Sequence, residues 1–175
     1  PIATNLSTSM VIDDVAGHFG VKLYRSKIGE AHVVKKMMKN NCLIGGEGNG
    51  GIIFPQITTV RDGLTALGLI LELMATTGKK LYSLANSWKT YPIIKEKIPI
   101  KGLDSQKVIQ ELISDFSHEN IDTQDGLKII KSNGWVHVRP SNTEPILRCY
   151  AEAVTDEAAR ELASMMIRKV EKFFT

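Results

Sequence analysis

The sequence predicts an α/β protein in two parts. The first is a layered α/β domain, with a mixed sheet and helices on both faces, and the second is a smaller α+β domain with an antiparallel sheet and two helices. Strand-like and helix-like patterns alternate through the first half, as in layered α/β domains. A stretch with two prolines and four charges, residues 89–99, interrupts this alternation. The runs beyond it suit an antiparallel sheet, so we expect domains at residues 1–88 and 89–175.

In the first half, each element follows from a local pattern. The strands are short apolar or alternating runs. The longest helix is bounded by the capping residues Asp62 and Gly78. It is apolar nearly all round, so we expect neighbours to cover it on more than one side. Strands are expected at residues 2–6, 21–24, 42–44 and 51–54, and helices at 10–19, 30–39, 63–77 and 80–88.

The second half begins with a strand that leaves the proline-containing stretch. Asp104 then caps a helix whose apolar residues recur at the helical period. Residues 132–134 form a turn between two strands, because Asn-Gly flanked by alternating apolar residues favours a hairpin. A strand at residues 146–153 follows, and the last helix starts at Thr155, where two acidic residues suit the helix N-terminus.

Composition and charge exclude several classes of protein. Of the 175 residues, 43% are hydrophobic and 23% are charged, which is ordinary for globular chains. The longest apolar run, residues 64–75, is too short for a membrane span of about 20 residues. A net charge of +3 does not call for a nucleic-acid partner. No export signal opens the chain and both cysteines lie in apolar runs, so we expect buried thiols and a cytoplasmic protein.

Several familiar catalytic patterns are missing from the sequence. The four histidines have no metal-ligand spacing. No Ser/His/Asp arrangement and no paired-cysteine zinc pattern can be assembled. We therefore expect no metal site in this chain and no catalytic residue of these kinds.

A glycine-rich segment, residues 45–51, places five glycines around Glu47 and Asn49. Glycines at this density permit positive φ angles and let a ligand approach the backbone. A carboxylate and an amide suit a hydroxyl-rich ligand, because the first accepts hydrogen bonds and the second both donates and accepts them. The glycine spacing matches the dinucleotide fingerprint, but a strand and a proline follow where that motif needs a helix. The alternative is a tight turn without a ligand.

A second segment, residues 139–145, offers one guanidinium, two hydroxyls and an amide between two strands, with Arg148 just beyond. Arginine, hydroxyl and backbone N–H donors make a concavity suited to phosphate. The alternative is an ordinary turn.

A third, weaker segment, residues 24–30, joins a strand to a helix with two cations and a hydroxyl. Helix N-termini bind anions, although many such loops bind nothing.

Together these segments resemble the α-D-phosphohexomutases, the family of phosphoglucomutase, phosphomannomutase and phosphoglucosamine mutase. The family's sugar-binding loop, Gly-Glu-x-Ser-Gly, is similar to Gly46-Glu47-Gly48-Asn49-Gly50. Its phosphate-binding loop, Arg-x-Ser-Asn/Gly-Thr-x-Pro, is similar to residues 139–145. Ser26 to Gly29 resembles the hinge-side Thr-x-Val-Gly loop. The resemblance covers the whole chain and corresponds to the third and fourth of the family's four domains.

The resemblance implies a sugar-binding domain at residues 1–88 and a phosphate-binding domain at residues 89–175. Asn49 replaces the usual Ser, and Gly51 stands where many members have His. These departures leave the choice among glucose, mannose and glucosamine phosphates open. The implied sugar-binding residues are Gly46, Glu47, Gly48, Asn49, Gly50, Ser26 and Gly29, and the implied phosphate-binding residues are Arg139, Ser141, Asn142, Thr143 and Arg148.

The family interconverts hexose 1-phosphates and 6-phosphates through a phosphoserine and a bisphosphate. This chain has no Thr-Ala-Ser-His-Asn-Pro-like segment for the phosphoserine and no Asp-Gly-Asp-Gly-Asp segment for magnesium. The resemblance therefore implies the C-terminal half of a longer enzyme, inactive alone, with magnesium, hexose phosphate and the N-terminal domains as its partners. The alternatives are a stand-alone phospho-sugar or nucleotide binding module, and a structural domain whose loops are simple turns.

Overall fold

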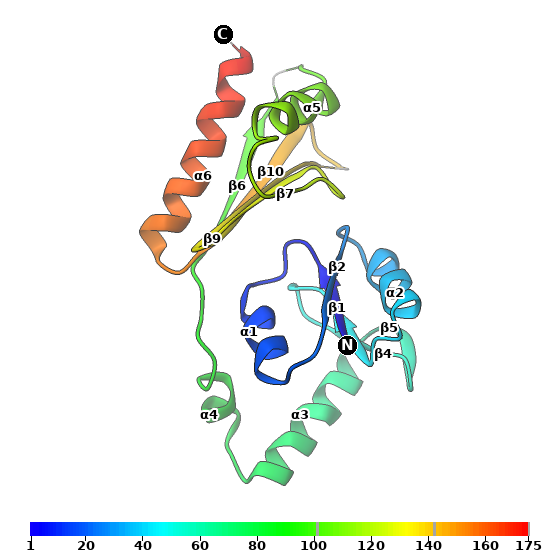
Figure 1. Cartoon of the computed structure of the whole chain (residues 1–175). Helices are drawn as coiled ribbons and strands as arrows, with labels where there is room; N and C mark the ends of the chain where they lie inside the picture. Colours follow the sequence, from blue (N-terminus) through cyan, green and yellow to red (C-terminus); the bar gives the residue numbers. More distant parts are fainter. Residues whose placement is uncertain (101, 142, 175) are drawn as a thin grey trace. The chain divides into compact units, whose positions relative to one another are not determined.

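The structure, a computed structural model, describes residues 1–100, 102–141 and 143–174. Asn142, an implied phosphate-binding residue, lies outside the described residues. The chain folds into two compact units, Pro1–Thr90 and Tyr91–Thr175, and each has its own sheet and helices (Figure 1). The predicted fold class is confirmed, because the first sheet is mixed and the second is antiparallel.

The first unit is built on a five-stranded sheet. Its strands are β1 (Ile2–Asn5), β2 (Leu23–Ser26), β3 (Ile44–Gly46), β4 (Ile52–Phe54) and β5 (Thr58–Asp62), in the order β2-β1-β3-β4-β5. Its helices are α1 (Val11–His18), α2 (Glu30–Lys39), α3 (Gly63–Thr77) and α4 (Leu81–Ala85). β1 pairs in parallel with β2 and β3, and β4 pairs antiparallel with β3 and β5. β2 and β3 begin two residues later than predicted.

The core of this unit lies between α2 and one face of the sheet. Val33 and Met37, which share a face of α2, are buried with Ala3 of β1 and Ile53 of β4. Gly45 of β3 makes the close packing possible, since a Cβ atom there would collide with the sulfur of Met37 and the carbonyl of Ala3. Figure 1 shows α1 and α2 on opposite sides of β1 and β2, so helices flank both faces as predicted.

β5 was not predicted. It forms an edge of the sheet, and its three middle residues are exposed. Such a strand lacks the alternation of apolar and polar residues by which strands are predicted. Its importance is positional, because it carries Arg61 to the glycine-rich segment.

α3 begins and ends at the predicted residues. The Asp62 carboxylate accepts hydrogen bonds from the backbone N–H groups of Leu64 and Thr65, and Gly78 is left-handed with a φ of 66°. The expectation that neighbours cover α3 on more than one side is wrong, because Leu64 is 80% exposed and Leu71 is 54% exposed. An apolar pattern shows which surroundings a helix favours, but not which neighbours the topology supplies. α3 follows an edge strand and packs mainly against β4 and α4.

The second unit is a five-stranded antiparallel sheet covered by two helices. Its strands are β6 (Ile93–Pro99), β7 (Ile121–Asp122), β8 (Leu127–Lys131), β9 (Gly134–Pro140) and β10 (Ile146–Ala153), in the order β6-β10-β9-β8-β7. The helices are α5 (Ser105–Asp115) and α6 (Asp156–Glu171), followed by the 3₁₀ turn η1 (Lys172–Phe174). The predicted hairpin joins β8 to β9, and Thr155 caps α6 through a hydrogen bond from the N–H of Ala158. The two-residue β7 was not predicted.

The core of the second unit is larger than that of the first. Leu112 of α5 and Met166 of α6 are buried with Leu127, Val136 and Leu147 of the sheet. Both cysteines are unpaired and buried, as predicted, and burial raises the pKa of the Cys149 thiol to about 12. Within the described residues, no helix is long and apolar enough to cross a membrane.

Candidate functional site

The glycine-rich segment forms the connection from β3 to β4. Gly50 and Gly51 have φ angles of 92° and 75°, which residues with a Cβ atom rarely adopt. A Cβ atom on Gly51 would lie 3.1 Å from the Cβ of Arg61 in β5. Gly48, Asn49 and Gly50 are exposed. The glycines therefore shape a loop whose tip faces solvent and whose base lies against β5.

The side chain of Glu47, in contrast, is only 5% exposed. Its Oε1 accepts hydrogen bonds of 2.8 Å from the Nδ2 of Asn5 and from the backbone N–H of Gly29. Its Oε2 lies 3.5 Å from the Nη1 of Arg61. The carboxylate thus joins the end of β1, the N-cap of α2 and β5. Among the implied sugar-binding residues, the structure brings Glu47 and Gly29 into direct contact.

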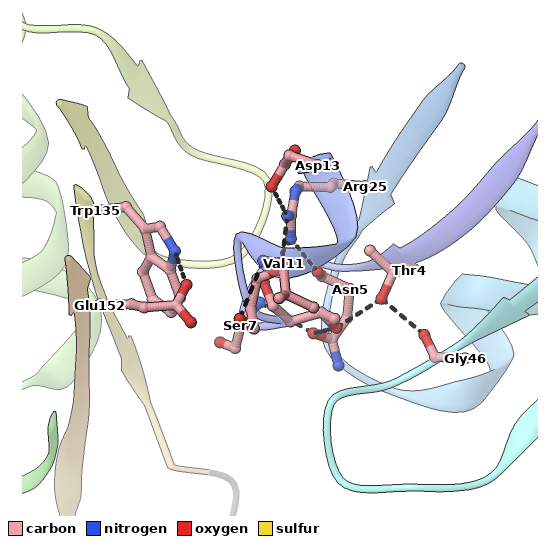
Figure 2. Close-up of polar contacts among 11 residues, drawn as sticks. Thr4, Asn5, Ser7, Val11, Asp13, Arg25, Gly46, Trp135 and Glu152 are labelled. Carbon is pink, nitrogen blue, oxygen red and sulfur yellow. Dashed lines mark hydrogen bonds and ion pairs between the residues drawn. The ribbon is translucent and has the colours of Figure 1, made fainter. Parts of the chain in front are cut away.

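Asn5, which belongs to none of the predicted site segments, is oriented by a network at the end of β1. Its Oδ1 accepts a hydrogen bond of 3.0 Å from the hydroxyl of Thr8. The hydroxyl of Thr4 lies 2.6 Å from the Thr8 Oγ1. It also lies 2.9 Å from the carbonyl oxygen of Gly46 (Figure 2). These contacts tie the residues after β1 to the glycine-rich segment and direct the Asn5 amide at Glu47.

The segment between β2 and α2 is the third candidate segment and the weaker of the two predicted for anion binding. Its Arg25 and Ser26 side chains, however, are used in contacts within the first unit. Arg25 donates to the carbonyl oxygen of Thr8 at 2.8 Å. It also pairs with Asp13 at 2.6 Å (Figure 2). Ser26 is 3% exposed, and its hydroxyl donates to the next backbone carbonyl at 2.9 Å. Of this segment, Gly29 reaches the glycine-rich loop, whereas Ser26 is engaged inside the unit.

Arg61 is a second residue of this site that lies outside the predicted segments. Its Nε donates to the Oε2 of Glu30 at 2.7 Å, and its Nη1 donates to the Oδ1 of Asn49 at 3.0 Å. The hydrogen bond to Glu30, helped by the nearby charge of Glu47, raises the pKa of Arg61. No motif marks this arginine, because the pairing of β4 with β5 alone brings it back to the loop.

In the second unit, three basic residues form a row across neighbouring strands. Arg148 of β10 is in register with Arg139 of β9 and with Lys97 of β6. Directly opposed residues of antiparallel strands share a face of the sheet, so three positive charges gather there at one level. Like charges so placed repel each other, which favours an anion between them. Lys97 was not among the predicted residues.

The segment between β9 and β10 lies beside this row. The Nε of Arg148 donates to the Oγ of Ser141 at 3.4 Å, and the backbone N–H of Thr143 donates to the same oxygen at 3.5 Å. The Nη1 of Arg139 donates to the carbonyl of Pro140 at 3.2 Å. The Arg139 Nε is buried and has no hydrogen-bond partner in the described part of the chain. An anion at this place would supply an acceptor for that donor.

A carboxylate partly balances the row. Glu144 lies 2.8 Å from the Nζ of Lys97 and 3.0 Å from the Nη2 of Arg148. The hydrogen bond from Lys97, with the charge of Arg148, lowers the pKa of Glu144, so it is ionised at neutral pH. Three cations with this single carboxylate leave a net positive face beside Ser141 and Thr143.

The two units match two consecutive family models. Residues 1–91 match "Phosphoglucomutase/phosphomannomutase, alpha/beta/alpha domain III", and residues 93–169 match the C-terminal domain of the same family. The chain belongs to the phosphoglucomutase/phosphomannomutase family. The resemblance inferred from the two loops is therefore confirmed.

Curated relatives of this family are much longer than this chain. A phosphoglucomutase/phosphomannomutase of Thermococcus kodakarensis is 38% identical over 174 residues, which cover 98% of this chain and 38% of the relative. A phosphoglucosamine mutase of Methanocaldococcus jannaschii is 33% identical, with 98% of this chain and 39% of the relative covered. The chain thus spans less than two fifths of the length of these relatives.

Solved structures share the fold. A phosphoglucomutase/phosphomannomutase family protein from Burkholderia thailandensis superposes with a TM-score of 0.83 at 22% identity, over 98% of this chain and 37% of that one. N-acetylphosphoglucosamine mutase from Aspergillus fumigatus, solved with GlcNAc-6P and magnesium, has a TM-score of 0.68 at 17% identity, over 97% of this chain and 38% of that one. At these identities the likeness concerns the fold alone.

Proposed function

We propose that this chain is the substrate-recognition part of a longer phosphohexomutase. That enzyme would interconvert hexose 1-phosphates and hexose 6-phosphates through a phosphoserine and a bisphosphate intermediate. Family membership and the coverage of the relatives support this proposal. The observation that carries it is the pair of loops, one with a carboxylate and an amide among glycines, the other beside a row of three cations.

In this proposal the phosphate that is not being transferred binds beside the cation row. Arg139, Arg148 and Lys97 supply charge, and Ser141 and Thr143 supply neutral donors. Asn142 is added to these phosphate-binding residues because of its position in the motif. The buried Nε of Arg139, for which the described residues offer no acceptor, supports this assignment, because a phosphate oxygen would satisfy it. Charge-assisted hydrogen bonds of this kind fix the substrate by position and electrostatics.

The sugar hydroxyls, in the same proposal, bind at the glycine-rich loop. Asn49 is exposed at its tip, and Gly50 faces open space, which leaves room for a close approach. Gly46 and Gly48 lie against the backbone of Gly51 and Thr8 and shape the base of the loop. Glu47 offers its Oε2, since Oε1 already accepts two hydrogen bonds. When the bisphosphate intermediate reorients end for end, its two phosphates exchange places, and the O3 and O4 hydroxyls roughly exchange places as well. One sugar loop and one phosphate loop can then serve both orientations.

The phosphoserine and the magnesium ion would belong to another part of the polypeptide. The described residues bring together no group of three His, Cys, Asp or Glu side chains that could hold a metal ion. The described residues thus offer no carboxylate cluster for magnesium, and we assign no magnesium site to them. We expect the 175-residue chain alone to show no mutase turnover.

The experiment that tests this function compares Arg139→Ala with Arg160→Ala in the full-length polypeptide. Arg160 is a matched control, because it forms an exposed ion pair with Asp156 on α6, away from the cation row. We expect Arg139→Ala to weaken glucose 6-phosphate binding, measured by titration calorimetry, by roughly thirtyfold, and Arg160→Ala to leave it unchanged. Normal binding by Arg139→Ala, or tighter binding of nucleotides than of hexose phosphates, would contradict the proposal.

A further inference from the structure

The two loop positions that depart from the family's pattern both contact one arginine. Asn49 stands where Ser is usual, and its Oδ1 accepts a hydrogen bond from Arg61 at 3.0 Å. Gly51 stands where many members have His, and it lies against the Arg61 stem, so a Cβ atom there would come within 3.1 Å of the Arg61 Cβ. The departures are therefore parts of one local arrangement around Arg61.

The guanidinium decides how the Asn49 amide is turned. Arginine has donors and no acceptor, so the atom of Asn49 that faces it must be the oxygen. The oxygen is thereby turned toward Arg61, and the amide NH₂ is directed away from it, available to other partners at the exposed loop tip. The loop consequently presents an N–H donor where a serine hydroxyl would both donate and accept.

Arg61 is itself anchored at two further points. Its Nε donates to Glu30 at the first turn of α2, at 2.7 Å. Its Nη1 also lies 3.5 Å from the Oε2 of Glu47. A planar guanidinium can span these acceptors at once, whereas a lysine ammonium on a flexible stem acts as a single point charge. The side chain of Arg61 is 35% exposed, so the glycine-rich loop that it contacts is accessible to a ligand from solvent.

We infer that Arg61 is a positioning residue that orients Asn49 as a hydrogen-bond donor toward an accepting oxygen of the bound hexose. It acts through Asn49 and does not itself touch the substrate. This inference rests on the proposed function. It deepens that function by stating which partner the sugar must offer at the glycine-rich loop: an acceptor, supplied by a hydroxyl of the ring.

The test is a double-mutant cycle in the full-length polypeptide with Arg61→Ala, Asn49→Ala and both together, measured with glucose 1-phosphate and glucosamine 1-phosphate. We expect each single variant to raise KM about tenfold with little change in kcat, as for lost ground-state binding. The double variant should be no worse than the poorer single variant, because Arg61 acts through Asn49. Arg61→Lys should restore KM only in part.

Two results separate this inference from the proposed function. If the KM increases of the two single variants multiply in the double variant, or if Arg61→Ala leaves KM unchanged while Asn49→Ala raises it, Arg61 does not position Asn49 and the inference fails alone. If neither Asn49→Ala nor Arg139→Ala alters hexose phosphate binding, the proposed function fails with it. Arg160→Ala, which removes a comparable exposed arginine–carboxylate pair, should keep KM unchanged and controls for charge loss.

Discussion

The carboxylate of Glu47 accepts a hydrogen bond of 2.8 Å from the backbone N–H of Gly29, which joins the glycine-rich loop to the start of α2. Gly29 is the N-cap of that helix and has a φ of 119°, a conformation that residues with a Cβ atom rarely adopt. The same carboxylate oxygen accepts a hydrogen bond from the side-chain amide of Asn5. Glu47 is therefore a structural centre of the first unit as well as a candidate for sugar recognition.

Glu47→Ala should destabilise the first unit. The variant leaves the Asn5 amide and the Gly29 N–H without their acceptor in a place where the Glu47 side chain is 5% exposed. We expect a loss of about 3 kcal/mol in the free energy of unfolding, and about half of that for Glu47→Gln, which keeps an acceptor oxygen. Urea unfolding followed by Trp88 fluorescence measures it, since Trp88 packs on His18 and Phe19 in this unit. Wild-type stability of Glu47→Ala would show that these hydrogen bonds contribute nothing.

The stability of the second unit should fall in mild acid because of His137. Burial lowers the pKa of His137 from 6.5 to about 4, and its Nε2 donates to the carbonyl oxygen of Asp125 at 2.6 Å. Since the folded-state pKa lies below the unfolded-state value, the unfolded chain binds a proton between these pH values that the folded chain does not. Stability is thus complete above pH 6.5 and declines by roughly 3 kcal/mol as the pH falls to about 4.

The measurement for His137 is the free energy of unfolding at about pH 7.5 and about pH 4.5, read from Trp135 fluorescence in a variant without Trp88. His137→Gln is the matched control, because its amide can donate the same hydrogen bond without titrating. We expect the control to lose less stability in acid than the wild type. Equal losses in both proteins would assign the acid sensitivity to other groups.

Two substitutions in the first unit should separate its core from the exposed face of α3. Ile53 is fully buried against α2, and Leu64 is 80% exposed. We expect Ile53→Ala to cost about 2–5 kcal/mol in the free energy of unfolding and Leu64→Ala to change it by no more than about 0.5 kcal/mol. Both are read from Trp88 fluorescence in urea. A large loss for Leu64→Ala would mean that the face of α3 is covered in solution.

Local patterns in the sequence sufficed for most of the fold. Caps at Asp62, Asp104 and Thr155, the hairpin at Asn133–Gly134 and the helical periodicities depend on residues close together in the chain, so they can be recognised there. The glycine-rich and Arg139-containing segments are likewise contiguous, which is why both could be singled out and compared with a family. β5 was not predicted, because an exposed edge strand lacks the alternation of apolar and polar residues.

The tertiary structure alone decided which distant residues join these segments. Asn5 and Arg61 reach the glycine-rich loop, and Lys97 joins Arg139 and Arg148, only through strand pairing and register. A shift of one residue in a strand turns every side chain to the other face, so such contacts cannot be derived from residue spacing. The exposure of α3 was also decided at this level, because burial depends on the neighbours that the topology supplies, whereas composition determines only how favourable burial would be.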